Sequence, residues 1–181
     1  MNVINKYIKA SINHKFSRYE YSLFNKFYEN ALSSSKVSVT VKTIDSLDKW
    51  KIYDNCIKHL TGRFFQIKAI KVEVNKDNWY QPIIEQLDIG ILALLGAIRN
   101  ERLEFLIQLK VEPGNINYIQ LSPTIQATKC NLDNVHNGES VRFMELIINN
   151  RENEKILLDR ELSEQNGRFL RKKNRNIIKI I

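Results

Sequence analysis

The feature that most constrains the fold of this chain is a series of short segments, rich in β-branched and aromatic residues, between residues 64 and 127. Turn formers such as Asn100 and the run Pro113-Gly114-Asn115 separate these segments, as they separate strands. The pattern predicts strands over 64–74, 89–99, 103–111 and 116–127. Only three polar residues link the second to the third, which favours an antiparallel hairpin over a crossover.

The residues before this series predict a helical entry to the domain. Apolar side chains recur at three-and-four spacing, which predicts a helix over residues 19–32, ended by the serines at 33–35. Alternating Val37, Val39 and Val41 predict a half-exposed strand. Asp45 or Ser46 can cap a second helix that runs to about Leu60 and closes at Gly62.

The C-terminal part predicts one more helix and a last pair of strands. Residues 141–159 have helical spacing, and residues 168–170 and 177–181 are expected to close the sheet as a hairpin. The fold class is therefore α+β, with a mixed, mainly antiparallel sheet. Since 181 residues make one ordinary domain, we expect an N-terminal helical extension over 1–35 and a single module over 36–181.

Composition excludes several classes of protein. Apolar runs such as 91–98 are far too short to cross a bilayer, and the polar N-terminus lacks the pattern of a secretory signal, so we expect a cytoplasmic protein. Cys56 and Cys130 have no CxxC spacing, so they indicate neither a disulfide framework nor a zinc site.

The net charge of +8 comes mostly from one stretch. Residues 167–181 hold six basic side chains and no carboxylate. Such a run can bind nucleic acid, an anionic membrane or a diphosphate, but it is most often a solvated face. We therefore rank nucleic-acid binding last.

Residues 108–128 carry an unusual density of neutral polar side chains within predicted strands. Alternate residues project to one side of a strand, so the even-numbered residues from 120 to 128 share a face, and Pro123 indicates an edge or a bulge. Two interpretations stay open: this face meets water, or its amides and hydroxyls bind sugar hydroxyls.

Several strings together resemble the NDP-hexose 2,3-dehydratase family. They are TGRFFQI at 61–67, WYQPIIEQLDIGILALLG at 79–96, QLKVEPGNINYIQLSPTIQAT at 108–128, NLDNVHNG at 131–138 and LSEQNGRF at 162–169. The resemblance implies a Nudix-like fold, a sheet between helices, and action on a dTDP-4-keto-6-deoxyhexose in deoxysugar biosynthesis. The Nudix catalytic box is absent from the sequence, which disfavours pyrophosphate hydrolysis, and we expect no metal and no cofactor.

The resemblance also raises a question of assembly. Family members usually carry two tandem copies of this module, whereas this sequence carries one. Two chains can therefore pair as a homodimer, or the lone module can bind sugar nucleotide without turning it over.

Dehydration of such a sugar needs a base at C3 and an acid for the departing C2 hydroxyl. Glu112 is the candidate base, with an exposed turn residue as the alternative. Lys110 is a candidate to neutralise an enolate or a phosphate, or simply pairs with Glu112. His136 is the candidate acid or phosphate partner.

For binding, Arg63 and Arg168 each follow a glycine at a predicted strand start, where a guanidinium can fork onto phosphate. Surface ion pairs are the alternative for both. Trp79 and Gln81 belong to a Trp-x-Gln-Pro element. Two interpretations of Trp79 stay open: its indole stacks on the base or sugar of a ligand, or it is packed in the hydrophobic core. The expected polar lining comprises Gln108, Asn115, Asn117, Gln120, Ser122, Thr124 and Gln126.

Overall fold

A computed structural model of the chain describes residues 3–128, 141–149 and 153–181. It begins with two helices, α1 (Val3–Asn13) and α2 (Arg18–Ser34). A capping box starts α2: the Ser17 hydroxyl accepts from the Glu20 N–H at 3.1 Å, and the Ser17 N–H donates to the Glu20 carboxylate at 2.8 Å. The helix predicted over 19–32 is therefore present, and α1 lies within the expected helical extension over 1–35, although no separate bounds were predicted for it.

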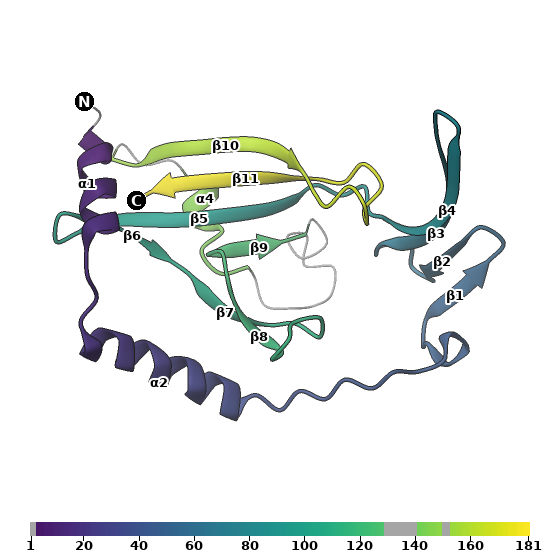
Figure 1. The fold of residues 1–181 in the computed structure, drawn as a ribbon, viewed down its shortest axis with the longest axis horizontal. Coiled ribbons are helices and arrows are strands. Elements are labelled where there is room, and N and C mark those ends of the chain that lie inside the picture. The colour runs from purple at the N-terminus through teal and green to yellow at the C-terminus, as the bar shows by residue number, and fades with distance from the viewer. Residues whose placement is uncertain (1–2, 129–140, 150–152) are drawn as a thin grey trace.

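The main sheet has the strand order β10-β11-β5-β6, and β9 also pairs with β5 (Figure 1). Its strands are β5 (Gly90–Arg99), β6 (Arg102–Leu106), β9 (Ile125–Ala127), β10 (Lys155–Ser163) and β11 (Lys173–Ile180). Only the β11–β5 pair is parallel. The mixed, mainly antiparallel α+β class is thus confirmed.

The expected hairpin after residue 99 is present as β5 and β6. Asn100 and Glu101 have φ of 49° and 57°, and two successive positive φ values match the twist of a tight hairpin turn.

Two smaller sheets flank the main one. Strands β7 (Gln108–Val111) and β8 (Ile119–Ser122) form a two-stranded ribbon. Strands β1 (Trp50–Tyr53), β2 (Cys56–His59), β3 (Gln66–Val74) and β4 (Asp77–Glu85) form an antiparallel sheet at the far end of the molecule (Figure 1). An extended segment connects α2 to this end and includes a short 3-10 turn, η1 (Ile44–Ser46).

The hydrophobic core lies where β5, β9 and β11 meet. Ala93, Ile125, Ala127 and Ile177 are buried there, and the residues around the short helix α4 (Glu145–Ile148) pack against them. Apolar alternation along β5 and β11 supplies this face, since alternate side chains of a strand project to one side.

Two predictions before residue 62 are wrong. Residues 37–41 form no strand, because this extended segment pairs with no other segment in the described part of the chain, and Val41 is 95% exposed. Residues 45–60 form no helix: Asp54 and Asn55 make a turn between β1 and β2, which pair antiparallel. Gly62, with φ of 67°, belongs to the turn that follows β2 instead of closing a helix.

Other predictions after residue 62 hold in part. Strand β4 was missed, and the strands predicted over 103–111 and 116–127 are each divided in two. Pro123 separates β8 from β9, because proline cannot donate to a strand ladder. Among the described residues of 141–159, α4 alone is an α-helix, and residues 155–159 belong to β10.

The C-terminal hairpin is β10 with β11, so residues 168–170 are not its first strand. They lie in the turn between the two strands and join the end of β4, where Ile84 N–H donates to Arg168 O and Leu170 N–H to Ile84 O, both at 2.8 Å.

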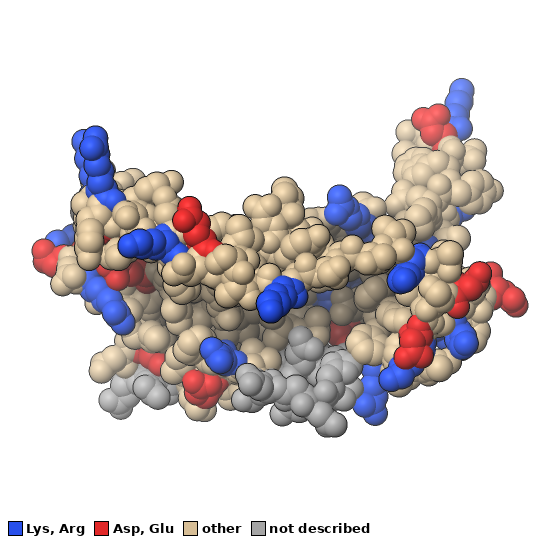
Figure 2. Space-filling model, turned by 90° about the horizontal axis from the view of Figure 1, so that it is seen from below, with Lys and Arg blue, Asp and Glu red and all other residues tan. Residues whose placement is uncertain are grey.

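The basic run at 167–181 is not a uniformly solvated face. Lys172 and Lys179 are buried, and Arg175 pairs with Asp159. On the face shown in Figure 2, basic and acidic side chains are interspersed over a largely uncharged surface. Among the described residues, no helix combines the length and apolar character that a membrane crossing requires.

Candidate functional site

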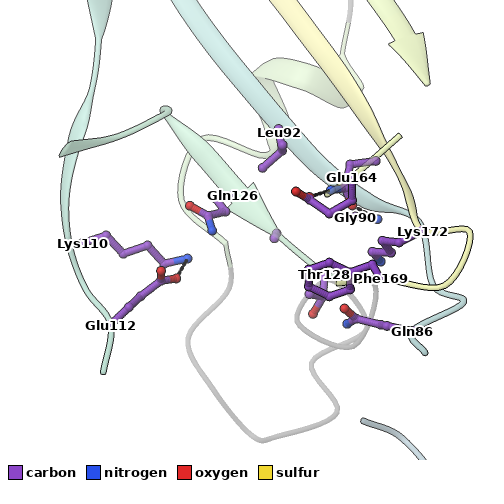
Figure 3. A pocket seen from close by; sticks show the side chains of 12 residues that line it. Gln86, Gly90, Leu92, Lys110, Glu112, Gln126, Thr128, Glu164, Phe169 and Lys172 are labelled. Carbon is purple, nitrogen blue, oxygen red and sulfur yellow. Dashed lines mark hydrogen bonds and ion pairs between the residues drawn. The ribbon is translucent and has the colours of Figure 1, made fainter. Parts of the chain in front are cut away.

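A pocket of about 280 Å³ opens beside the main sheet, where β5 and β9 meet the end of β7 and the turn between β10 and β11 (Figure 3). Its lining combines charged, amide and apolar groups. These are Gln86, Gly90, Leu92, Lys110, Glu112, Gln126, Ala127, Thr128, Glu164, Phe169, Lys172 and Asn174. Convergent polar groups in one concave site are the usual mark of a ligand pocket.

One wall of the pocket is the end of β7. Lys110 Nζ lies 2.9 Å from Glu112 Oε1, and both side chains are about one-third exposed. The Glu112 N–H donates to Tyr118 O at 2.9 Å, so the loop from 112 to 118 is closed at its base. This closure fixes the backbone from which the Glu112 carboxylate reaches the pocket.

The opposite wall is built from β11 and the residue that follows β10. Asn174 Oδ1 accepts from the Gly90 N–H at 3.2 Å, and Asn174 Nδ2 donates to Glu164 Oε2. A Cβ at Gly90 would lie 2.8 Å from Asn174 Oδ1 and 3.1 Å from Ala127 O. The Asn174 side chain can therefore occupy this place only because residue 90 is glycine.

Lys172 and Phe169 extend the same wall. Lys172 is only 4% exposed and its ammonium donates to Asp88 O. The parallel pairing of β11 with β5 brings this C-terminal segment beside residues 86–92, more than 80 positions earlier in the chain.

The nearest carboxyl with a perturbed pKa is that of Glu85, next to Gln86. A hydrogen bond from Lys68, at 2.8 Å, holds the pKa of Glu85 below its ordinary value. Gln66 also donates to this carboxylate. These contacts join the ends of β3 and β4 beside the pocket.

Of the residues proposed from the sequence, the structure brings Glu112, Lys110 and Gln126 together in the pocket. Three others make internal contacts outside the lining. Gln108 Nε2 donates to Thr124 O, Thr124 is fully buried and donates to Leu106 O, and Asn115 Nδ2 donates to Lys110 O at 3.3 Å.

The remaining polar residues of this segment lie on the ribbon or its loop. Gln120 is directly opposite Lys110, and Ser122 is opposite Gln108, so these four side chains share one face. Asn117 is exposed in the loop. The polar face predicted from the even-numbered residues is thus present on β8, but Pro123 interrupts it. Beyond Pro123, Thr124 is buried in the core, whereas Gln126 and Thr128 line the pocket.

Trp79 and Gln81 connect to the turn that carries Arg168. Trp79 Nε1 donates to Gln81 Oε1 at 2.8 Å, and Gln81 Nε2 donates to Gly167 O at 3.1 Å. Arg168 is exposed beside Phe169 of the pocket, whereas Arg63 lies in the connection between β2 and β3 and does not line it.

His136 lies outside the described residues. Sequence reasoning missed Glu164, Lys172 and Asn174. Glu164 belongs to the family-like string at 162–169, which could have identified it, but only Arg168 was selected from that string. Lys172 and Asn174 lie within the basic run, which gave no signal for either of them. Within the part of the chain that the structure describes, no three His, Cys, Asp or Glu side chains gather as a metal site would need.

Comparison with known proteins gives a consistent result. The family model described as NDP-hexose 2,3-dehydratase matches residues 22–181. The chain is 36% identical over 162 residues to a dTDP-4-dehydro-6-deoxy-alpha-D-glucopyranose 2,3-dehydratase of Saccharopolyspora spinosa, covering 86% of this chain and 32% of the relative.

Proteins with the same name from Streptomyces violaceoruber and Amycolatopsis orientalis are 33% and 38% identical. These matches cover 86% and 73% of this chain, and 36% and 30% of the relatives. The chain thus spans about a third of the length of the curated relatives that it matches.

Proposed function

Since the chain belongs to the NDP-hexose 2,3-dehydratase family, we propose that it is a hydro-lyase that removes water across C2 and C3 of a dTDP-4-keto-6-deoxyhexose in deoxysugar biosynthesis. The observation that carries the proposal is the pocket beside β5, whose lining includes the Lys110–Glu112 pair, the amides of Gln86 and Gln126 and the Thr128 hydroxyl. The relatives named above are dehydratases of such a sugar nucleotide.

The chemistry requires a base near C3. The C4 ketone acidifies the C3 proton, and its removal gives an enolate that expels the C2 hydroxyl. We assign proton removal to Glu112, whose carboxylate stands in the pocket on the fixed end of β7. Lys110, 2.9 Å from Glu112, is placed to stabilise negative charge that develops on the C4 oxygen.

The later steps need no electron transfer. Loss of the hydroxyl leaves a double bond between C2 and C3 with a hydroxyl on C3, and this enol becomes a 3,4-diketo-2,6-dideoxy sugar when C2 takes up a proton. Water is the only other product. The reaction as a whole therefore calls for proton transfer and charge stabilisation, not for a redox cofactor.

The size of the pocket suggests which part of the ligand it holds. About 280 Å³ lies just below the range of about 300–1,000 Å³ that is typical of whole-ligand pockets. We therefore place the hexose in the pocket, where Gln126 and Thr128 can bond its hydroxyls. The diphosphate and base would continue past Phe169 toward Arg168 and Trp79, which the Gln81–Gly167 hydrogen bond connects.

We extend the proposal to architecture and location. A Nudix-like arrangement is supported by the mixed sheet with its single parallel pair, β11–β5, and by α4 on its face. A reducing, cytoplasmic setting is supported by the free thiol of Cys56.

We also propose that the working form is a homodimer. The accessible surface of the chain is 14109 Å², about one and a half times the roughly 9,100 Å² that scaling gives for a compact monomer of this mass. The apolar side of α2 accounts for part of it, since no residue of α2 is buried and Tyr19 and Phe27 are 72% and 62% exposed. The excess is ample for a stable interface, which buries about 1,200–2,000 Å² in total.

The test compares Glu112→Gln with the unmodified chain on dTDP-4-keto-6-deoxyglucose, with water loss followed by mass spectrometry. Because a general base contributes about 10²–10⁴-fold, we expect kcat to fall by that factor while the dissociation constant of the substrate changes little. Glu104→Gln, an exposed carboxylate on β6 outside the pocket, is the matched control and should keep full activity.

Two results would contradict the proposal in different ways. Full activity of Glu112→Gln would exclude Glu112 as the base. Saturable binding of the sugar nucleotide by the unmodified chain without any change in ligand mass would favour a binding module that depends on a partner for turnover.

A further inference from the structure

The pocket holds a second carboxylate, Glu164, across from Glu112 (Figure 3). It comes directly after β10, whereas Glu112 follows β7, so the two belong to opposite walls. Nothing in the proposed reaction so far uses Glu164. The reaction also needs an acid that makes the C2 hydroxyl able to leave, because hydroxide departs poorly without a proton. The candidate acid from the sequence, His136, lies outside the described residues.

The surroundings of the two carboxylates differ. Glu112 has the Lys110 ammonium at 2.9 Å. Glu164 is held by neutral donors: Asn174 Nδ2 donates to its Oε2, and the Gln165 N–H donates to its Oε1 at 3.3 Å. The two carboxyl groups thus have different partners and face one site from opposite walls, which allows them different parts in proton transfer.

The position of Glu164 is also built by the fold. Asn174, which is 8% exposed, accepts from the Gly90 N–H and donates to Glu164, so its amide is held from both sides. Lys172, the other candidate proton donor on this wall, has its ammonium engaged by Asp88 O. Glu164 is thus the side chain that this wall presents in a fixed orientation.

We propose that Glu164 is the general acid of the dehydration, an inference that rests on the function proposed above. Glu112 takes the proton from C3, and the electron pair of that bond moves into the enolate. As the C2–O bond breaks, the neutral Glu164 carboxyl gives its proton to the departing oxygen, which leaves as water. When the enol ketonises, Glu164 accepts the C3 hydroxyl proton and Glu112 returns a proton to C2, so both residues regain their starting states.

The first experiment measures Glu164→Gln in D2O, with elimination and C3–H exchange read separately by mass spectrometry. Exchange at C3 needs only the base, so the variant should still introduce one deuterium into unreacted dTDP-4-keto-6-deoxyglucose. Its rate of water loss should fall by about 10²-fold or more, the contribution of a general acid. Glu161→Gln, an exposed carboxylate three positions earlier on β10, should behave as the unmodified chain does.

The second experiment replaces the C2 hydroxyl of the substrate by fluorine. Fluoride leaves without a proton, so Glu164→Gln should eliminate it at a rate within about threefold of the unmodified chain, whereas Glu112→Gln should not. A role of Glu164 in folding or binding alone would slow both substrates equally, so this rescue separates an acid from a merely structural residue.

Three results would overturn the inference. The first is that Glu164→Gln retains water loss. The second is that it loses C3 exchange while it still binds substrate, and the third is that it fails to eliminate fluoride. The failure of the function itself gives a different pattern, because the unmodified chain would then eliminate neither water nor fluoride.

Discussion

At the scale of single residues, Gly90 has the most sharply defined role beside the pocket. A Cβ there would lie 2.8 Å from Asn174 Oδ1 and 3.1 Å from a backbone oxygen. Gly90→Ala should therefore displace Asn174 and destabilise the fold by about 1–3 kcal/mol, the usual cost of overpacking. Chemical denaturation measures this.

Gly114→Ala is the control for that prediction, because nothing lies within 4 Å of the added Cβ. Its free energy of unfolding should change by less than about 0.5 kcal/mol. Equal stabilities for the two variants would show that Asn174 is not held against Gly90.

The sequence could predict Glu112 and Lys110 because they lie in one short polar segment. It could not predict that Glu164 and Asn174 face them, since the parallel pairing of β11 with β5 brings them there. Thr124 shows a related limit. Its spacing of two from Ser122 and Gln126 predicts a lining residue, but the break between strands at Pro123 places its side chain in the core.

At the scale of elements, the β10–β11 hairpin is linked by an ion pair. Arg175 Nε and Nη2 donate to the two Asp159 oxygens at 2.8 and 2.6 Å. The hydrogen bond from Arg175 holds the pKa of Asp159 below its ordinary value of 3.8. A lowered folded-state pKa means that the stabilisation is present above the ordinary value and is lost as pH falls through the folded one.

Arg175→Met should therefore lower the melting temperature at pH 7, and the difference from the unmodified chain should shrink as pH falls below about 4. Lys173→Met is the matched control, because its ammonium is 4.0 Å from Glu161, a contact of little energy. A difference in melting temperature that does not depend on pH would contradict this account.

A buried lysine joins β11 to the segment around α4. Lys179 is 1% exposed, lies 2.7 Å from a Glu154 oxygen, and donates to Leu146 O and Asn149 O at 2.6 and 2.8 Å. Lys179→Met should cost about 3–5 kcal/mol, because it leaves the buried Glu154 carboxylate without this cation.

The double variant Lys179→Met/Glu154→Leu tests the reason for that cost. It should recover most of the lost stability in urea denaturation, since removal of both charges leaves none buried alone. A double variant as unstable as the single one would show that the carbonyl contacts, not the charge, carry the effect.

Local pattern and tertiary pairing together decide which strands the sequence could predict. Strands β3 and β5 have strong local patterns and occur nearly where expected, at Gln66–Val74 and Gly90–Arg99. The wrong helix over 45–60 has suitable caps, but the tertiary pairing of β2 with β1 and with β3 overrides local preference. The strand expected at 37–41 did not form for the opposite reason, because no described strand pairs with this segment.

At the scale of the whole molecule, the exposed apolar side of α2 gives a prediction about assembly. The chain should sediment with about twice its mass of 21.3 kDa. Leu23→Asp/Phe27→Asp should yield monomers, because both side chains are at least half exposed and belong to the same apolar stripe.

Arg18→Glu is the control, since it lowers the net charge by the same two units at an exposed position on the other side of α2. It should leave the mass unchanged. A monomeric unmodified chain, or dimers of the Leu23→Asp/Phe27→Asp variant, would contradict the proposed interface.

Dehydration of a sugar nucleotide by this chain would change the mass of the ligand, which mass spectrometry measures. Purified protein is incubated with dTDP-4-keto-6-deoxyglucose and the mixture is followed over time by mass spectrometry. Our account predicts the loss of one water by the unmodified chain, and its near absence with Glu112→Gln. A ligand whose mass stays unchanged, at protein concentrations where binding is saturated, would contradict it.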